Sequence, residues 1–169
     1  MNRLVEIDFK EDSGLVGVDA ILTGDLLKAL DEMGHGDAVV IADAHFTATK
    51  LAKNPVIYMP GLSTPRVLQA IRTVFVPDEF EPYQLGLMEC PGGDLLEVQT
   101  ELIDVSLLEE PTISCGEKPE NSRAPHVRML DRQAFYDRAA KAELIIRTGE
   151  TRVYGNALFF KGVTPVPAT

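Results

Sequence analysis

The chain has 169 residues, 45% of them hydrophobic, and a formal net charge of −10. This length suits one domain with a buried core. The acidic balance argues against binding to nucleic acid or to anionic membrane surfaces, because both attract basic proteins. The first residues do not resemble a signal peptide, and no run of about 18 apolar residues could span a membrane.

The two cysteines, Cys90 and Cys115, lack the CxxC spacing of redox and metal motifs. Two cysteines in a chain of this length do not indicate a disulfide framework. We therefore expect reduced thiols and a cytoplasmic protein.

The first predicted helix covers residues 24–33. Thr23 is suited to cap its start through a side-chain oxygen, and Gly34 is suited to end it in a left-handed conformation. The all-apolar run 38–42 follows, and it predicts a strand that is covered on both faces.

A second helix is expected to begin at Pro65, with Thr64 as its N-cap. Residues 83–88 predict a strand. Residues 107–125 hold three prolines and many polar residues, so we expect a long surface excursion there.

The last third of the chain alternates again between strand and helix. Residues 126–130 predict a strand, and Asp131 can cap a helix over 132–142. Further strands are expected at 144–147 and 157–160.

This alternation predicts an α/β fold of three layers, α/β/α, with a largely parallel central sheet and helices on both faces. The whole chain, 1–169, is expected to form a single domain.

Polar residues follow several of the predicted strands. Asp43, His45 and Arg132 do so, as do residues 148–150. Ligands of open α/β sheets bind outside the carboxyl ends of the strands, so these groups predict a site if the strands are parallel. Each also has a simpler explanation: Asp43 as a cap, His45 as a loop residue and Arg132 as a surface cation.

His35 stands between Gly34 and Gly36, which leave its imidazole uncrowded. Histidine titrates near neutral pH and is a natural proton shuttle, although a polar turn residue would look the same. With Asp37, Asp43 and His45 it could also suggest a metal site. The spacing matches no metal motif, and an apolar strand separates the two pairs, so we expect no metal.

Five segments in order resemble the FucU/RbsD family. They are residues 26–37, 43–46, 132–139, 148–156 and 161–165. The glycine after His35, the Asp-Ala-His-Phe segment and Arg132 are similar to the L-fucose mutarotase branch. The resemblance implies the RbsD-like form of the fold and an enzyme that interconverts the anomers of L-fucose or a closely related sugar, without a cofactor.

The same resemblance implies roles for individual residues. His35 would be the catalytic proton donor, and Asp43 is the candidate base. The expected sugar-binding residues are Asp43, His45, Arg132, Tyr154 and Asn156. The family also implies a ring-shaped homo-oligomer, an octamer or a decamer. The N-terminal lead, residues 1–17, and the stretch between Asp43 and Arg132 are longer than is usual in the family.

One geometric argument sharpens the expectation. His35 precedes the 38–42 strand and Asp43 follows it, and five strand residues span about 16 Å. One small sugar cannot touch both ends. We therefore predict that the site is composite and lies at a subunit interface, with His35 supplied by a neighbouring subunit.

Two other functions fit the sequence. A non-catalytic monosaccharide-binding or transport-accessory protein would have the same pocket. A metal-dependent sugar isomerase or hydrolase would need a metal site that the spacing does not favour.

Overall fold

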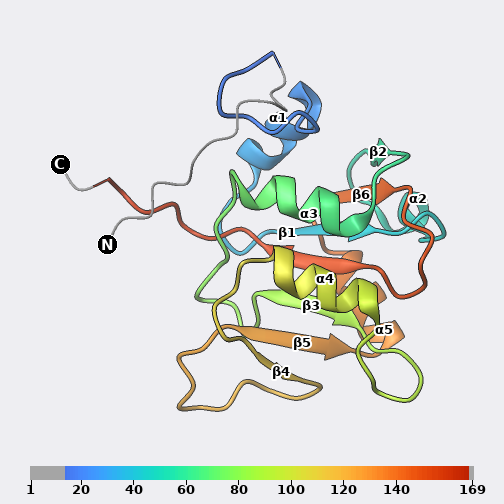
Figure 1. The fold of residues 1–169 in the computed structure, drawn as a ribbon, viewed down its shortest axis with the longest axis vertical. Helices are drawn as coiled ribbons and strands as arrows, with labels where there is room; N and C mark the ends of the chain where they lie inside the picture. Colours follow the sequence, from blue (N-terminus) through green and yellow to red (C-terminus); the bar gives the residue numbers. More distant parts are fainter. Residues whose placement is uncertain (1–13, 168–169) are drawn as a thin grey trace.

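A mixed sheet flanked by helices forms the centre of the computed structural model, which describes residues 14–167 (Figure 1). The strands are β1 (Ala38–Ala42), β2 (Ile57–Met59), β3 (Leu85–Met88), β4 (Thr112–Ser114), β5 (His126–Leu130), β6 (Leu144–Thr148) and β7 (Ala157–Phe160). The helices are α1 (Gly24–Glu32), α2 (Ala48–Leu51), α3 (Thr64–Arg72), α4 (Glu97–Val105) and α5 (Arg132–Ala139).

The strand order within the described residues is β2-β6-β1-β7-β3-β5-β4. Among the named strands of residues 14–167, only β7 runs antiparallel to its neighbours, β1 and β3, and every other strand pairing is parallel. The arrowheads of β1, β5 and β6 accordingly point to one side of the molecule (Figure 1). The carboxyl ends of six strands and the start of β7 therefore share one edge.

Two apolar cores lie on opposite faces of this sheet. Helices α1, α3 and α4 bury their apolar residues in the first core, together with alternate residues such as Val39 and Ile41 of β1. Helices α2 and α5 do the same on the other face, against Val40 and Ala42. The predicted three-layer fold with a largely parallel sheet is confirmed, and all of β1 is buried because both of its faces are covered.

Helix α1 begins as expected but ends differently. The Thr23 hydroxyl accepts a hydrogen bond from the backbone N–H of Leu26. The expected left-handed Gly34 is wrong: the positive φ, +80°, belongs to Gly36. The Lys161 ammonium group donates to carbonyl groups in the last turn of α1 and just beyond it, so these carbonyls need no glycine motif.

The cap of α3 is also displaced from its prediction. Ser63, rather than Thr64, accepts the capping hydrogen bond, from the N–H of Arg66. Thr64 is instead the first helical residue and is buried, and Pro65 remains in the first turn, where its missing N–H costs nothing.

Asp131 caps α5 as predicted, by accepting from the N–H of Ala134. The helix ends at Ala139, three residues earlier than expected. The strand expected over 83–88 begins only at Leu85.

The expected excursion over residues 107–125 contains the short edge strand β4, which pairs in parallel with β5. Helices α2 and α4 and strand β2 had no sequence prediction. The expected N-terminal extension, 1–17, falls largely outside the described residues. None of the helices in residues 14–167 has the length and apolar composition that crossing a bilayer requires.

Leu102 anchors α4 to the first core, where it is 0% exposed, whereas Leu107 beyond the helix is 66% exposed. Leu102→Ala should therefore lower the free energy of unfolding by about 2–5 kcal/mol, because it leaves a cavity. Leu107→Ala is the matched control and should change it by less than about 0.5 kcal/mol. Equal effects in chemical denaturation would contradict this description of the core.

Candidate functional site

The shared edge of the sheet gathers polar side chains from distant parts of the chain. Asp43 directly follows β1, Arg132 opens α5 just after β5, and Asn156 directly precedes β7. Because β7 runs against its neighbours, the residue before it reaches the same edge as residues that follow parallel strands. This edge therefore holds residues that leave the parallel strands together with the residue that enters β7.

A hollow of about 240 Å³ lies at this edge. Its lining residues are Asp43, His45, Phe46, Met88, Arg132, Tyr136, Val153, Tyr154 and Asn156. All five residues that the sequence indicated for sugar binding are among them. The volume is below the range of about 300–1,000 Å³ that is usual for drug-sized ligands, and it suits a single small ring.

Asp43 and Asn156 hold each other in place. The Asp43 N–H donates to Asn156 Oδ1 at 2.7 Å, and Asn156 Nδ2 donates to Asp43 Oδ2 at 2.9 Å. The N–H of His45 donates to the other carboxylate oxygen at 2.9 Å. Both side chains of the pair are buried. A carboxylate oxygen can accept more than one hydrogen bond, so this carboxylate is oriented and still able to bind a hydroxyl group.

An aromatic wall adjoins these polar groups. The Arg132 guanidinium lies over the Tyr136 ring at 5.3 Å, and its Nε donates to the Tyr136 hydroxyl at 3.3 Å. Phe46 meets the same ring edge-on, with centroids 5.5 Å apart. This wall can pack against the C–H face of a sugar while the arginine donates to its hydroxyl groups.

Sequence reasoning missed four lining residues: Phe46, Met88, Tyr136 and Val153. The sequence contains a usable signal for two of them. Tyr136 is four positions after Arg132 on a predicted helix, so the two share a face. Met88 ends a predicted strand and falls under the same edge rule as Asp43.

His35 lies at the opposite edge of the sheet, in the turn before β1. Its side chain is 65% exposed, and its Nδ1 is 3.6 Å from Oδ2 of Asp78, which is 0% exposed. Asp78 Oδ1 accepts from the N–H groups of Phe80 and Glu81. Its Oδ2 has no hydrogen-bond donor within residues 14–167. Asp78 was missed because only the tertiary fold brings it to His35.

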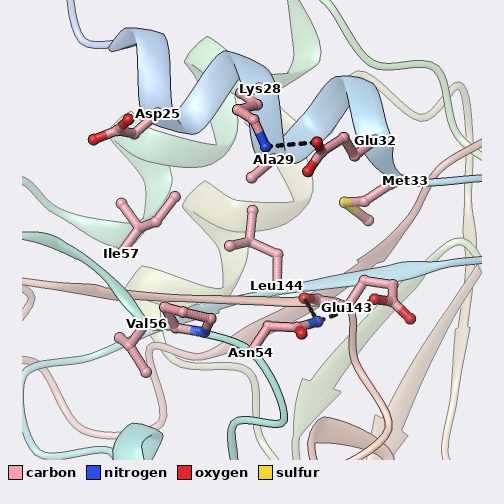
Figure 2. A pocket seen from close by; sticks show the side chains of 11 residues that line it. Asp25, Lys28, Ala29, Glu32, Met33, Asn54, Val56, Ile57, Glu143 and Leu144 are labelled. Atoms are coloured by element: carbon pink, nitrogen blue, oxygen red, sulfur yellow. Dashed lines mark hydrogen bonds and ion pairs between the residues drawn. The ribbon is translucent and has the colours of Figure 1, made fainter.

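A larger groove of about 590 Å³ runs between α1 and the start of β6 (Figure 2). None of the sequence-predicted site residues lines it. Its polar side chains are largely paired with one another: Lys28 with Glu32, and Asn54 with Glu143. The groove therefore offers few free polar groups to orient a ligand.

The histidine and carboxylate pairs considered for a metal lie apart. His35 and Asp37 precede β1, and Asp43 and His45 follow it. Within residues 14–167, no three histidine, cysteine, aspartate or glutamate side chains are grouped closely enough to share a metal ion.

Comparison with known proteins decides the family. The model of the RbsD / FucU transport protein family matches residues 16–164. The chain belongs to the RbsD/FucU family. An L-fucose mutarotase of Glaesserella parasuis serovar 5 is 40% identical over 152 residues, which are 90% of this chain and 97% of that protein.

Solved structures of the RbsD/FucU family share this fold. A fucose mutarotase from Streptococcus pneumoniae, solved in complex with L-fucose, matches with a TM-score of 0.74 at 29% identity, over 89% of this chain and 100% of that one. Bacillus subtilis RbsD, complexed with D-ribose, matches with a TM-score of 0.61 over 86% of this chain and 96% of that one. At 19% identity, it supports the fold alone.

Asn156→Ala should test the paired carboxylate. It leaves the buried N–H and Oδ2 of Asp43 without their partner, so the free energy of unfolding should fall by about 1–3 kcal/mol and monosaccharide binding should weaken. Asn54→Ala removes an exposed amide that bonds Glu143 and should change stability by less than about 0.5 kcal/mol. Denaturation and sugar titration of both variants make the comparison. Indistinguishable variants would contradict a role for the pair.

Proposed function

We propose that this protein interconverts the α and β anomers of L-fucose, or of a closely related monosaccharide. The observation that carries the proposal is the hollow in which Asp43, Asn156, Arg132 and Tyr154 converge. It occurs in a chain that is 40% identical to an L-fucose mutarotase over nearly its whole length. A catalyst of this kind needs only positioned acids and bases.

The chemistry opens a cyclic hemiacetal and closes it again on the other face of the carbonyl. The bond between the anomeric carbon and the ring oxygen breaks as the ring oxygen gains a proton and the anomeric hydroxyl loses one. Closure reverses both proton transfers. Acid–base groups in position for such transfers contribute about 10²–10⁴-fold each. In our proposal His35 is the acid, and Asp43 is the base that also anchors a hydroxyl group.

The remaining residues of the hollow would bind and orient the sugar. Arg132 offers a planar set of N–H donors to neighbouring hydroxyl groups, and Tyr154 and Asn156 complete the polar wall. His45 is a further candidate contact, because it lines the hollow beside Asp43. No step requires a cofactor.

His35 would act on a sugar that is bound to another subunit. Its imidazole is exposed, and β1, a five-residue strand of about 16 Å, separates it from Asp43 of the same chain. Nδ1 of the imidazole lies 3.6 Å from the buried Asp78 carboxylate, so Nε2 is the nitrogen that would face the sugar.

A subunit that places the His35 edge of its sheet against the hollow of the next copy makes a head-to-tail contact. Such heterologous contacts close into rings when the rotation per subunit allows it. We therefore propose a ring-shaped homo-oligomer, an octamer or a decamer, with sites at the subunit interfaces. We also propose a cytoplasmic location, which is supported by the free state of both cysteines.

His35→Gln should separate a mutarotase from a sugar-binding protein. Loss of the proton donor should slow anomer exchange by about 10²–10⁴-fold, measured by saturation-transfer NMR. L-fucose affinity, measured by calorimetry, should change far less. Wild-type protein that binds the sugar and gives no exchange above the uncatalysed rate would instead indicate a binding function.

Mixing two variants that each lack one half of the site should test the composite site. When His35→Gln and Asn156→Ala subunits are unfolded together and reassembled, roughly a quarter of the sites in a random ring pair an intact histidine with an intact hollow. Exchange should therefore return to a comparable fraction of the wild-type rate. Each variant reassembled alone is the control. No recovery in mixed rings of native size would rule out the two-subunit site.

A further inference from the structure

We propose that Arg152 is a positioning residue, held by Glu101 of α4 and by Glu150, which sets the conformation of the sugar-facing residues Tyr154 and Asn156. Neither Arg152 nor either glutamate lines the hollow. The segment that the three residues hold, 149–156, connects β6 to β7 and supplies much of the wall. The kinetic part of the test rests on the proposed mutarotase function.

Arg152 is the centre of a dense set of charge-assisted hydrogen bonds. Its two terminal nitrogens donate to the two oxygens of Glu101, both at 2.9 Å. Its Nε and Nη2 donate to the two oxygens of Glu150 at 3.0 Å, and its backbone N–H donates to Glu150 as well. Paired forks of this kind restrict orientation as well as distance, which a single ammonium group cannot do.

Glu150 links this cluster directly to the hollow. Its side chain is buried, and its carbonyl accepts from the N–H of Ala44, the residue after Asp43, at 2.8 Å. Its own N–H donates to the Thr148 hydroxyl, which in turn donates to the Ala42 carbonyl at the end of β1. The segment is therefore tied to both sides of Asp43.

The backbone that follows Arg152 needs such restraint. Tyr154 has a φ of +58°, a left-handed conformation that is unfavourable for a residue with a side chain. Gly155 packs so closely that an added Cβ would lie 3.0 Å from the Glu150 side chain and 3.1 Å from Val98 of α4. The buried Gln99 amide of α4 donates to the carbonyls of Met88 and Tyr154, at 2.7 and 3.4 Å.

The charge states suit this role. Hydrogen bonds from Arg152 lower the pKa of Glu101. Burial alone would raise the pKa of Glu150, but hydrogen bonds from Arg152 outweigh it and the net direction is down. Both carboxylates are therefore ionised at neutral pH. The Arg152–Glu101 pair is exposed, and such pairs contribute little to global stability, so the effect of breaking it should appear in the local segment.

Arg152→Lys and Glu101→Gln test the proposal, with Glu97→Gln as the control. Glu97 is exposed on the same helix, and its side chain makes no ion pair within residues 14–167. The two test variants should lower kcat/KM for anomer exchange by about tenfold, since misplaced binding groups cost that much or more. Their L-fucose affinity should fall as well, and Glu97→Gln should stay within about twofold of wild type.

Hydrogen exchange of the peptide that spans 149–156, followed by mass spectrometry, separates a local loss of restraint from global destabilisation. It should quicken in both test variants while the melting temperature and oligomer size stay unchanged. Unchanged kinetics, a loss of activity without faster exchange in this peptide, or a loss that follows global destabilisation would each overturn the proposal. If the wild-type protein proved inactive on sugars, the hydrogen-exchange comparison would still test whether Arg152 and Glu101 restrain segment 149–156.

Discussion

Strand β7 enters the middle of the sheet against the direction of both neighbours, and the whole site depends on this reversal. It brings Asn156 to the end of β1, where the amide and Asp43 exchange two hydrogen bonds. At the far end of β7, Lys161 pairs with Gly36 and Asp37 through backbone hydrogen bonds. One strand therefore joins the turn that carries His35 to the edge that carries the hollow, and both are held rigidly relative to each other.

The sequence predicted the elements whose signals are local. β1, β5 and β7 have the bounds expected, and Thr23 and Asp131 cap their helices, because an apolar run or a cap is visible in neighbouring residues. The errors at Gly34 and Thr64 are errors of detail at helix ends. At the end of α1, hydrogen bonds from Lys161 take the place of a glycine motif. At the start of α3, Ser63 supplies the cap one position before Thr64. Neither substitute is visible from the local pattern alone.

The site was less predictable than the fold for a physical reason. Residues that follow parallel strands share an edge, so Asp43 and Arg132 could be placed together before the sheet order was known. Asp78 and the α4 residues Gln99 and Glu101 act through contacts with distant segments, and no spacing rule links them to His35 or Tyr154. Pairing across the sheet, which the sequence does not encode locally, decides these contacts.

The exposed side chains of the two edges add a further argument for joining them. Phe80, whose ring lies 6.2 Å from that of His35, is 81% exposed, and Val153 on the rim of the hollow is 63% exposed. Single exposed apolar residues are ordinary, but here each stands beside one half of the proposed composite site. A head-to-tail contact that delivered His35 to the hollow would bury apolar surface from both edges. That burial would offset part of the repulsion between subunits that each carry a net charge of −10.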